Sequence, residues 1–134
     1  MSGGGNHIDD LLYPELSYTI IGILFDVYNE IGPGYRESHY ENSVAHGFDI
    51  AGLKYKEQLP YTVTYRGKKT GRYFFDLLIE NKIIVELKVG DYFSRRNIHQ
   101  ASEYLKASDL QLAILANFTS KGVKYKRIVN IIIN

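Results

Sequence analysis

The 134-residue sequence contains no cysteine. Without thiols the chain can form neither a disulfide framework nor a thiolate metal site, so any metal must be held by carboxylate, imidazole, amide or carbonyl groups. Such donors suit hard cations such as Mg²⁺. The sequence also lacks the apolar start of a signal peptide and any run long enough to cross a bilayer. We therefore expect an intracellular, cytoplasmic, soluble protein with no membrane partner.

Neither sign of charge is in excess, because 16 Lys and Arg residues face 15 Asp and Glu residues, for a net charge of +1. This balance does not by itself indicate a nucleic-acid partner, so the distribution of charge matters more. Basic residues gather in three segments: Arg66, Lys68, Lys69 and Arg72; Arg95 and Arg96; and Lys121, Lys124, Lys126 and Arg127. Each cluster taken alone is also typical of solvated turns and strand edges.

The length and an ordinary balance of 45% hydrophobic and 23% charged residues predict one domain with one sizeable core. Residues 1–13 begin with a run of glycines, which we interpret as a disordered tail or a scar left by cloning. Residues 14–134 show no internal repeat, no linker and no sign of a second domain. We expect them to form a single domain.

Three segments have the periodicity of helices. Apolar residues recur at spacings of three and four over residues 15–31, and Gly32-Pro33-Gly34 then ends the pattern. A second helix is predicted over residues 37–51, with Gly52 as its terminator. A third is predicted over residues 95–107.

Five segments are predicted to be strands. Residues 55–65 and 72–79 are rich in aromatic and β-branched residues and are separated by turn-forming residues 66–71. A tight turn at residues 80–82 leads to residues 83–89, and the last strands are predicted at 112–116 and within 123–132. A strand, helix and strand after a meander predict an α/β or α+β fold, with a mixed central sheet flanked by helices.

The third predicted strand carries charges that a core does not need. Glu86 and Lys88 lie two residues apart and so share one face of that strand. If Ile79 pairs with Ile83 around the turn, Asp76 lies opposite Glu86, with side chains about 5 Å apart. Two opposed carboxylates are best explained by a divalent cation between them. The alternative is that Lys88 simply neutralises the two acids at a solvated sheet face.

Two helices add polar groups to this set. Glu37, Tyr40 and Glu41 lie on adjoining turns of one side of the second helix, although Glu37 in a first turn also stabilises the helix dipole. On the third helix, Gln100 and Tyr104 are spaced i,i+4, which directs both away from the apolar face. An amide at Gln100 could orient water or phosphate.

These segments carry a resemblance that covers nearly all of the chain after residue 13. Its carriers are Gly34, Glu37 and Tyr40; Asp76-Leu77-Leu78; Ile84-Val85-Glu86-Leu87-Lys88; Gln100 with Tyr104-Leu105-Lys106; and Ala116-Asn117-Phe118. The sequence resembles the family named for its GxxExxY motif, which is grouped with the PD-(D/E)XK nucleases. The resemblance implies a restriction-endonuclease-like core.

The resemblance also implies roles for individual residues. Asp76, Glu86 and Lys88 stand at the signature positions, Glu37 at the helical acid, and Gln100 at the helical polar position beside the site. Asp76, Glu86, the Leu87 carbonyl and Glu37 are expected to hold Mg²⁺ or Mn²⁺ against a scissile phosphate. Tyr40 and Tyr104 are expected to support them. The implied activity is phosphodiester hydrolysis of nucleic acid, with DNA preferred over RNA.

A substrate would approach this acidic site over a basic rim. We expect the rim to comprise Arg95, Arg96, Lys121, Lys124 and Lys126. Two other readings stay open, a nucleic-acid-binding module that acts only within a complex, and a protein-interaction domain whose 12 tyrosines include interface anchors. The chain could also act as a homodimer or in a larger complex.

Overall fold

The computed structural model describes residues 12–130, and its elements follow the predicted order. Residues 1–11 of the expected tail lie outside the described part, whereas Leu12 and Tyr13 pack against the core. The elements are α1 (Pro14–Ile31), α2 (Glu37–Ala51), β1 (Tyr55–Tyr65), β2 (Lys68–Ile79), β3 (Ile83–Val89), α3 (Arg95–Ser108), β4 (Leu112–Thr119) and β5 (Gly122–Val129).

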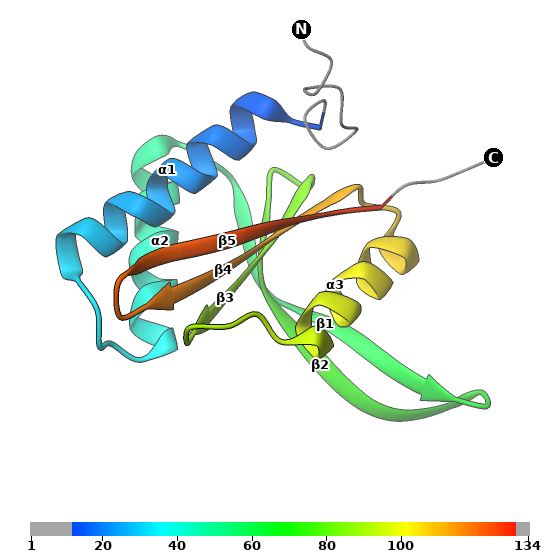
Figure 1. Cartoon of the computed structure of the whole chain (residues 1–134). Helices are drawn as coiled ribbons and strands as arrows, with labels where there is room; N and C mark the ends of the chain where they lie inside the picture. Colours follow the sequence, from blue (N-terminus) through cyan, green and yellow to red (C-terminus); the bar gives the residue numbers. More distant parts are fainter. Residues whose placement is uncertain (1–11, 131–134) are drawn as a thin grey trace, which may run out of the picture.

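The five strands form one mixed sheet in the order β1-β2-β3-β4-β5. The pair β3–β4 is parallel and the other three pairs are antiparallel, because α3 carries the chain across the sheet between β3 and β4. Helices α1 and α2 lie on one side of the sheet and α3 on the other (Figure 1). This arrangement confirms the predicted α+β class with a mixed sheet flanked by helices.

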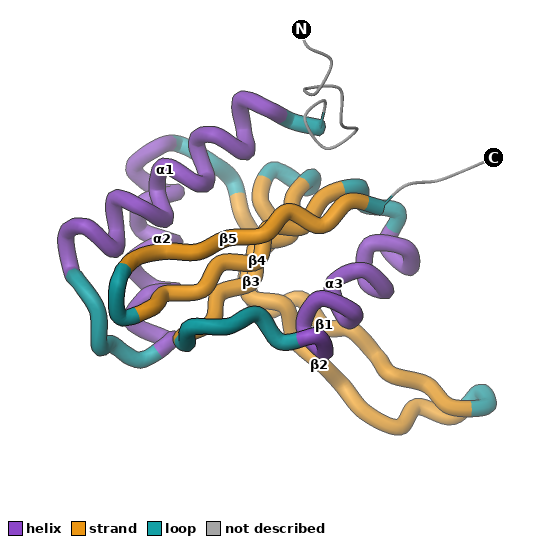
Figure 2. The backbone as a smooth tube through the Cα atoms, in the orientation of Figure 1, coloured by secondary structure: helices purple, strands orange, loops and turns teal. Residues whose placement is uncertain are grey.

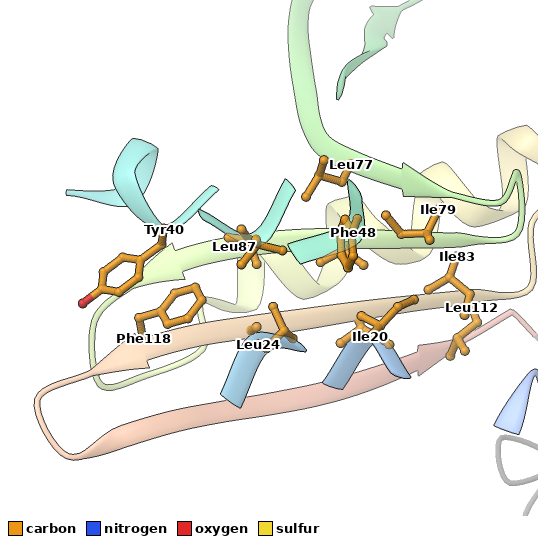
Figure 3. Packing of buried hydrophobic residues seen from close by; sticks show 14 residues of the cluster. Ile20, Leu24, Tyr40, Phe48, Leu77, Ile79, Ile83, Leu87, Leu112 and Phe118 are labelled. Atoms are coloured by element: carbon orange, nitrogen blue, oxygen red, sulfur yellow. The ribbon is translucent and has the colours of Figure 1, made fainter. Parts of the chain in front are cut away.

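Each face of the sheet has its own core layer. The first layer, between the sheet and α1 and α2, includes Leu24, Phe48 and Leu87 (Figure 3). The second layer, between the sheet and α3, includes Ile84 and Leu105. Burial of large apolar side chains such as these is worth about 1.5–3 kcal/mol each, so both layers contribute to holding the sheet rigid. None of the described helices is long and apolar enough to span a bilayer.

The first turn of α2 is fixed by an aromatic anchor. The Tyr40 ring stacks on Phe118 of β4, with ring centroids 4.1 Å apart, and its hydroxyl donates to the Gly32 carbonyl at 2.7 Å (Figure 3). Both rings are fully buried. The start of α2, including Glu37, is therefore held at the end of the sheet where β3 and β4 finish.

The hairpin of β1 and β2 differs from the prediction in its length. Residues 66–71 were predicted to be a turn, but Tyr65 pairs with Lys68 and only Arg66 and Gly67 turn the chain, both with positive φ. Two left-handed residues make the tight turn whose twist matches that of the flanking strands. β2 consequently begins at Lys68, and β4 extends to Thr119 rather than Ala116 because it continues to pair with β5.

This hairpin also leaves the sheet. β1 and β2 are paired at ten positions, whereas β2 is paired with β3 only at Leu77–Val85, Leu78–Ile84 and Ile79–Ile83. The remainder of the hairpin projects beyond the body of the molecule as a two-stranded ribbon (Figure 2). Counted from the turn that joins them, β2 and β3 thus separate beyond the Leu77–Val85 pair.

Candidate active site

Two carboxylates occupy the point where β2 and β3 separate. One residue beyond the last paired position, the Asp76 amide donates to Glu86 Oε1 at 2.9 Å, and the Leu87 amide donates to Asp76 Oδ2 at 2.7 Å. Side-chain oxygens take the place of the main-chain acceptors that a continued ladder would supply. The two side chains are 8% and 2% exposed, so each acid is anchored by a peptide group of the opposite strand.

The shape of β2 explains why Asp76 stands at this point. Leu77 packs into the first core layer, but Phe75, two residues earlier, packs into the second, so the strand changes sides at Asp76. In β1, Gln58 adopts a left-handed φ of 55° between the pairs Glu57–Leu77 and Leu59–Phe75. Both strands are distorted at the same level, as is typical beside active sites.

A lysine from β3 and an acid from α2 complete the cluster. Lys88 Nζ lies 3.9 Å from Glu86 Oε2 and 3.6 Å from Glu37 Oε1, and the Lys88 and Glu37 side chains are partly exposed. Ile79 pairs with Ile83, which is the register that puts Asp76 beside Glu86. The structure therefore brings together Asp76, Glu86, Lys88 and Glu37.

Two further residues belong to the cluster: Glu41, which the sequence placed on the same side of α2 as Glu37 but to which no role was assigned, and Tyr73, which was not predicted. The Tyr73 hydroxyl donates to Glu86 Oε2. The Glu41 carboxylate interacts with Asp76 and accepts a hydrogen bond from Gln58 Nε2 at 3.2 Å. The i,i+4 spacing from Glu37 was a signal for Glu41, whereas no sequence pattern distinguished Tyr73 from the other tyrosines of the hairpin.

Three acids of this cluster, Asp76, Glu41 and Glu86, have raised pKa values. Burial, followed by the charge of Glu86, raises the pKa of Asp76 from 3.8 to about 7. Burial, followed by the charge of Asp76, raises the pKa of Glu41 from 4.5 to about 7. Burial also raises the pKa of Glu86, against the opposing hydrogen bond from Tyr73. Lys88 alone therefore does not neutralise the cluster.

Tyr73 acts as a neutral donor to this group. Burial first, and then its hydrogen bond to Glu86, raises the pKa of the Tyr73 hydroxyl. The hydroxyl thus keeps its proton at physiological pH and directs it at Glu86 Oε2. This bond occupies an oxygen that could otherwise hold a cation.

The donor set fits a hard divalent cation. Carboxylate oxygens and the Leu87 carbonyl are ligands that Mg²⁺ and Mn²⁺ prefer, and a cation would relieve the repulsion that raises the carboxyl pKa values. Within residues 12–130, no three acidic or histidine side chains are already spaced as metal ligands. Metal binding would therefore require the acids to give up bonds that they now make, such as that from Tyr73.

Gln100 and Tyr104 lie on α3 but make no bond to the acids in the described part of the chain. The Gln100 amide oxygen is buried and accepts no hydrogen bond. The Tyr104 ring packs on Phe75 and Tyr61, with centroids 4.6 and 5.7 Å apart. Tyr104 thus supports the strand next to Asp76 through packing, while the Gln100 oxygen remains an unpaired acceptor within the protein.

Two of the predicted rim lysines share a sheet face with the site. Lys124 is aligned with Asn117 and Lys88 across three strands, and Lys126 with Leu115 and Glu86. Residues aligned in this way point to the same side of a sheet. Lys124 and Lys126 are both exposed.

The connection from β3 to α3 crosses this face. Asn117 Nδ2 donates to the carbonyls of Gly90 and Tyr92, and Lys124 Nζ donates to that of Asp91. Ser94 then caps α3, which exposes Arg95 and Arg96 in its first turn, and Lys121 lies exposed in the β4–β5 turn. The predicted rim is thus spread over the loop, the helix start and the last strand.

A groove of the described structure lies elsewhere. It has a volume of about 600 Å³ between α1 and α2 and is lined by residues such as Val27, His46 and Ile50. None of the clustered acids lines it. The acid cluster instead lies where β2 and β3 separate, with Asp76 and Glu86 buried and the Lys88 and Glu37 side chains partly exposed.

The raised carboxyl pKa values predict how the metal-free protein responds to pH. A carboxyl whose pKa is higher in the folded state stabilises the fold below its unfolded pKa, near 4, and loses that contribution as pH rises through about 7. The free energy of unfolding in chelator should therefore fall between pH 5 and pH 8, as measured by urea denaturation. Glu41→Gln removes one titrating group and should weaken this dependence. An unfolding free energy that stays level or rises over this range would contradict the assignment.

The fold and the cluster together define a nuclease-like core: a mixed sheet between helices, with an acid on one central strand and an acid and a lysine on the next. The profile of the PD-(D/E)XK nuclease superfamily matches residues 14–128. The chain belongs to this superfamily, which confirms that part of the resemblance.

Other comparisons add little to this assignment. No curated protein shows significant similarity to the chain. Among solved structures, the one described as "Crystal structure of SSO0001" is similar, with a TM-score of 0.46 and 13% identity, covering 90% of this chain and 80% of that one. The superfamily assignment therefore rests on the profile match.

Proposed function

We propose that the chain is a metal-dependent nuclease that hydrolyses phosphodiester bonds of DNA. The observation that carries this proposal is the meeting of Asp76, Glu86 and Lys88 at the separation of β2 and β3, in a chain of the PD-(D/E)XK superfamily. Buried acids of raised pKa next to a lysine are costly for a structural role alone and useful for binding a cation and a phosphate.

Within the superfamily, we infer that the chain belongs with the GxxExxY proteins. The physical roles of the three motif residues support this inference. Gly34 has a φ of 93°, which favours glycine, in the turn before α2. Tyr40 anchors α2 on Phe118, and Glu37, one turn before Tyr40, reaches Lys88. The motif thus describes a turn, an anchor and the acid that they position.

In the proposed reaction, Asp76, Glu86, the Leu87 carbonyl and Glu37 hold Mg²⁺ or Mn²⁺. The ion, when bound, supplies Lewis acidity toward the scissile phosphate and lowers the pKa of the attacking water. Lys88 adds positive charge beside the phosphate as negative charge develops on its oxygens. Its contact with Glu37 keeps the Lys88 ammonium at the mouth of the cluster.

Other residues of the chain shape the site rather than react. Tyr73 holds Glu86 by a hydrogen bond, and the Leu87 amide orients Asp76. Gln100, whose amide oxygen is buried and accepts no hydrogen bond from residues 12–130, would orient a water molecule or phosphate. A nucleic-acid backbone that approaches the site would meet positive charge from the basic rim, which comprises Arg95, Arg96, Lys121, Lys124 and Lys126.

A panel of labelled nucleic acids tests the proposal. Single-stranded and duplex DNA, RNA and hybrids are incubated with Mg²⁺, Mn²⁺ or EDTA, and products are separated by electrophoresis. We expect DNA to be cleaved with either metal, no cleavage in EDTA, and about a thousandfold lower rate for Glu86→Gln, which loses one anionic ligand. The matched control is Glu103→Gln, because Glu103 pairs only with Lys106 on the surface of α3.

The outcomes separate the alternatives. Binding of nucleic acid without cleavage of any substrate would favour a module that acts within a complex. Neither binding nor cleavage would favour a protein-interaction domain.

A further inference from the structure

The ribbon formed by β1 and β2 beyond the site concentrates positive charge. We call residues 59–75 the arm. The arm contains Arg66, Lys68, Lys69 and Arg72 and no acidic residue. All four basic residues are exposed. The arm carries four positive charges while the whole chain carries +1, so the rest of the molecule is net negative.

Exposed aromatic rings accompany these charges. The Arg66 guanidinium lies over the Tyr65 ring at 5.2 Å, and that of Arg72 lies over Phe74 at 5.5 Å. Tyr65 is 62% and Phe74 44% exposed. Large exposed aromatic rings beside arginines are a surface on which sugars and bases stack while the guanidinium contacts phosphate. Solvation of the charges alone does not require the aromatic rings.

The direction of the arm is fixed relative to the acids. At its base, Tyr61 and Phe75 pack on Tyr104 of α3. Tyr73 packs on Phe75 and donates a hydrogen bond to Glu86. Asp76 directly follows the arm in β2. At about 3.3 Å per residue, Arg72 lies about 13 Å and Lys69 about 23 Å along the strand from Asp76.

We propose that the arm is a second nucleic-acid-binding surface, which grips the backbone of duplex DNA to one side of the cleaved bond. This inference rests on the proposed nuclease function and adds how the substrate is held. A two-stranded ribbon fits a groove of duplex DNA. The spacing of the four basic residues from Asp76, from Arg72 to Arg66, corresponds to about four to ten base pairs, at 3.3 Å per residue and 3.4 Å per base pair. The duplex must therefore extend that far beyond the reacting phosphate.

The test compares two variants that each lose four positive charges. The arm variant carries Arg66→Ala, Lys68→Ala, Lys69→Ala and Arg72→Ala. The control variant carries Lys54→Ala, Lys56→Ala, Lys82→Ala and Lys106→Ala. Lys54 directly precedes β1, Lys56 lies in β1, Lys82 lies in the turn between β2 and β3, and Lys106 lies on α3. Melting curves establish that both variants are folded. Binding to labelled duplexes of 6, 10, 14 and 20 base pairs is measured by fluorescence anisotropy in EDTA over a range of salt concentrations.

We expect the arm variant to bind the 14- and 20-base-pair duplexes at least tenfold more weakly than the control variant. The difference should be smaller on the 6-base-pair duplex, which, counted from Asp76, reaches Arg72 but not Lys69, Lys68 or Arg66. The slope of log K against log salt on long duplexes should fall by about 0.9 for each lost contact. Cleavage of long duplexes with Mg²⁺ should show the same length dependence.

The outcomes distinguish failure of this inference from failure of the proposed function. Wild type that cleaves DNA while the arm and control variants bind all lengths alike would overturn the role of the arm and leave the nuclease function standing. Length-dependent loss of binding in a protein that cleaves nothing would support the arm and count against the nuclease function. An equal loss on the 6-base-pair duplex would also overturn the inference, because it would show that the basic residues beyond Arg72 do not hold the longer duplexes.

Discussion

Asp76→Asn is expected to lower the rate of metal-dependent DNA cleavage by about a thousandfold or more, because it removes an anionic ligand from a site that the proposed reaction needs. The change is close to isosteric, and an Asn oxygen can still accept the hydrogen bond that the Leu87 amide gives to Asp76. The loss should therefore come from charge and not from unfolding. Single-turnover cleavage rates with Mg²⁺ and with Mn²⁺ measure it.

The same substitution should stabilise the metal-free protein. Asp76 is buried beside Glu86, and its pKa of about 7 means that ionisation at pH 8 opposes folding. A neutral Asn avoids this cost, so the free energy of unfolding in EDTA at pH 8 should rise by about 2 kcal/mol. The gain should shrink as pH falls and vanish only below about pH 4, where Asp76 is protonated in both the folded and the unfolded state.

A lower cleavage rate together with a higher free energy of unfolding would show that Asp76 destabilises the folded protein and is needed for activity. Asp26→Asn, at an exposed position of α1, is the matched control and should change neither quantity appreciably. A variant that is both inactive and strongly destabilised at pH 8 would show instead that Asp76 has a structural role.

The central register could be predicted because local rules determine it. Glu80 and Asn81 both adopt left-handed φ values, 53° and 56°, in the turn that brings Ile79 opposite Ile83. Asn readily adopts this conformation, and the apolar pattern of β3 fixes which side chains face inward. The positions of Asp76 and Glu86 followed from that turn.

The rest of the cluster depends on tertiary structure. Glu41 and Tyr73 reach the acids because β2 changes sides at Asp76, opposite the left-handed Gln58, and neither distortion has a sequence signature. The length of the hairpin was also underestimated. A positive φ is uncommon for residues other than Gly, Asn or Asp, so a two-residue turn that begins at Arg66 was not expected. The hairpin and the basic residues near its tip were predicted, but the turn was predicted to be longer than it is.

The sequence alone left two roles open for Lys88. It could neutralise the acids, or it could stabilise the reacting phosphate. If it only neutralises them, its loss should mainly raise repulsion within the cluster. If it acts on the phosphate, its loss should mainly slow the reaction. The position of its ammonium, between Glu86 and Glu37 and partly exposed, permits both contacts.

We expect Lys88→Met to lower the cleavage rate by about a hundredfold to a thousandfold, the usual effect of removing one group that stabilises developing charge. Metal affinity should increase rather than decrease, because a competing cation within 3.9 Å of Glu86 has been removed. Isothermal titration with Mn²⁺ and single-turnover cleavage measure the two quantities. Lys106→Met, which breaks a surface salt bridge to Glu103, is the control. If Lys88→Met weakens metal binding as much as it slows cleavage, Lys88 maintains the arrangement of the acids and does not act on the phosphate.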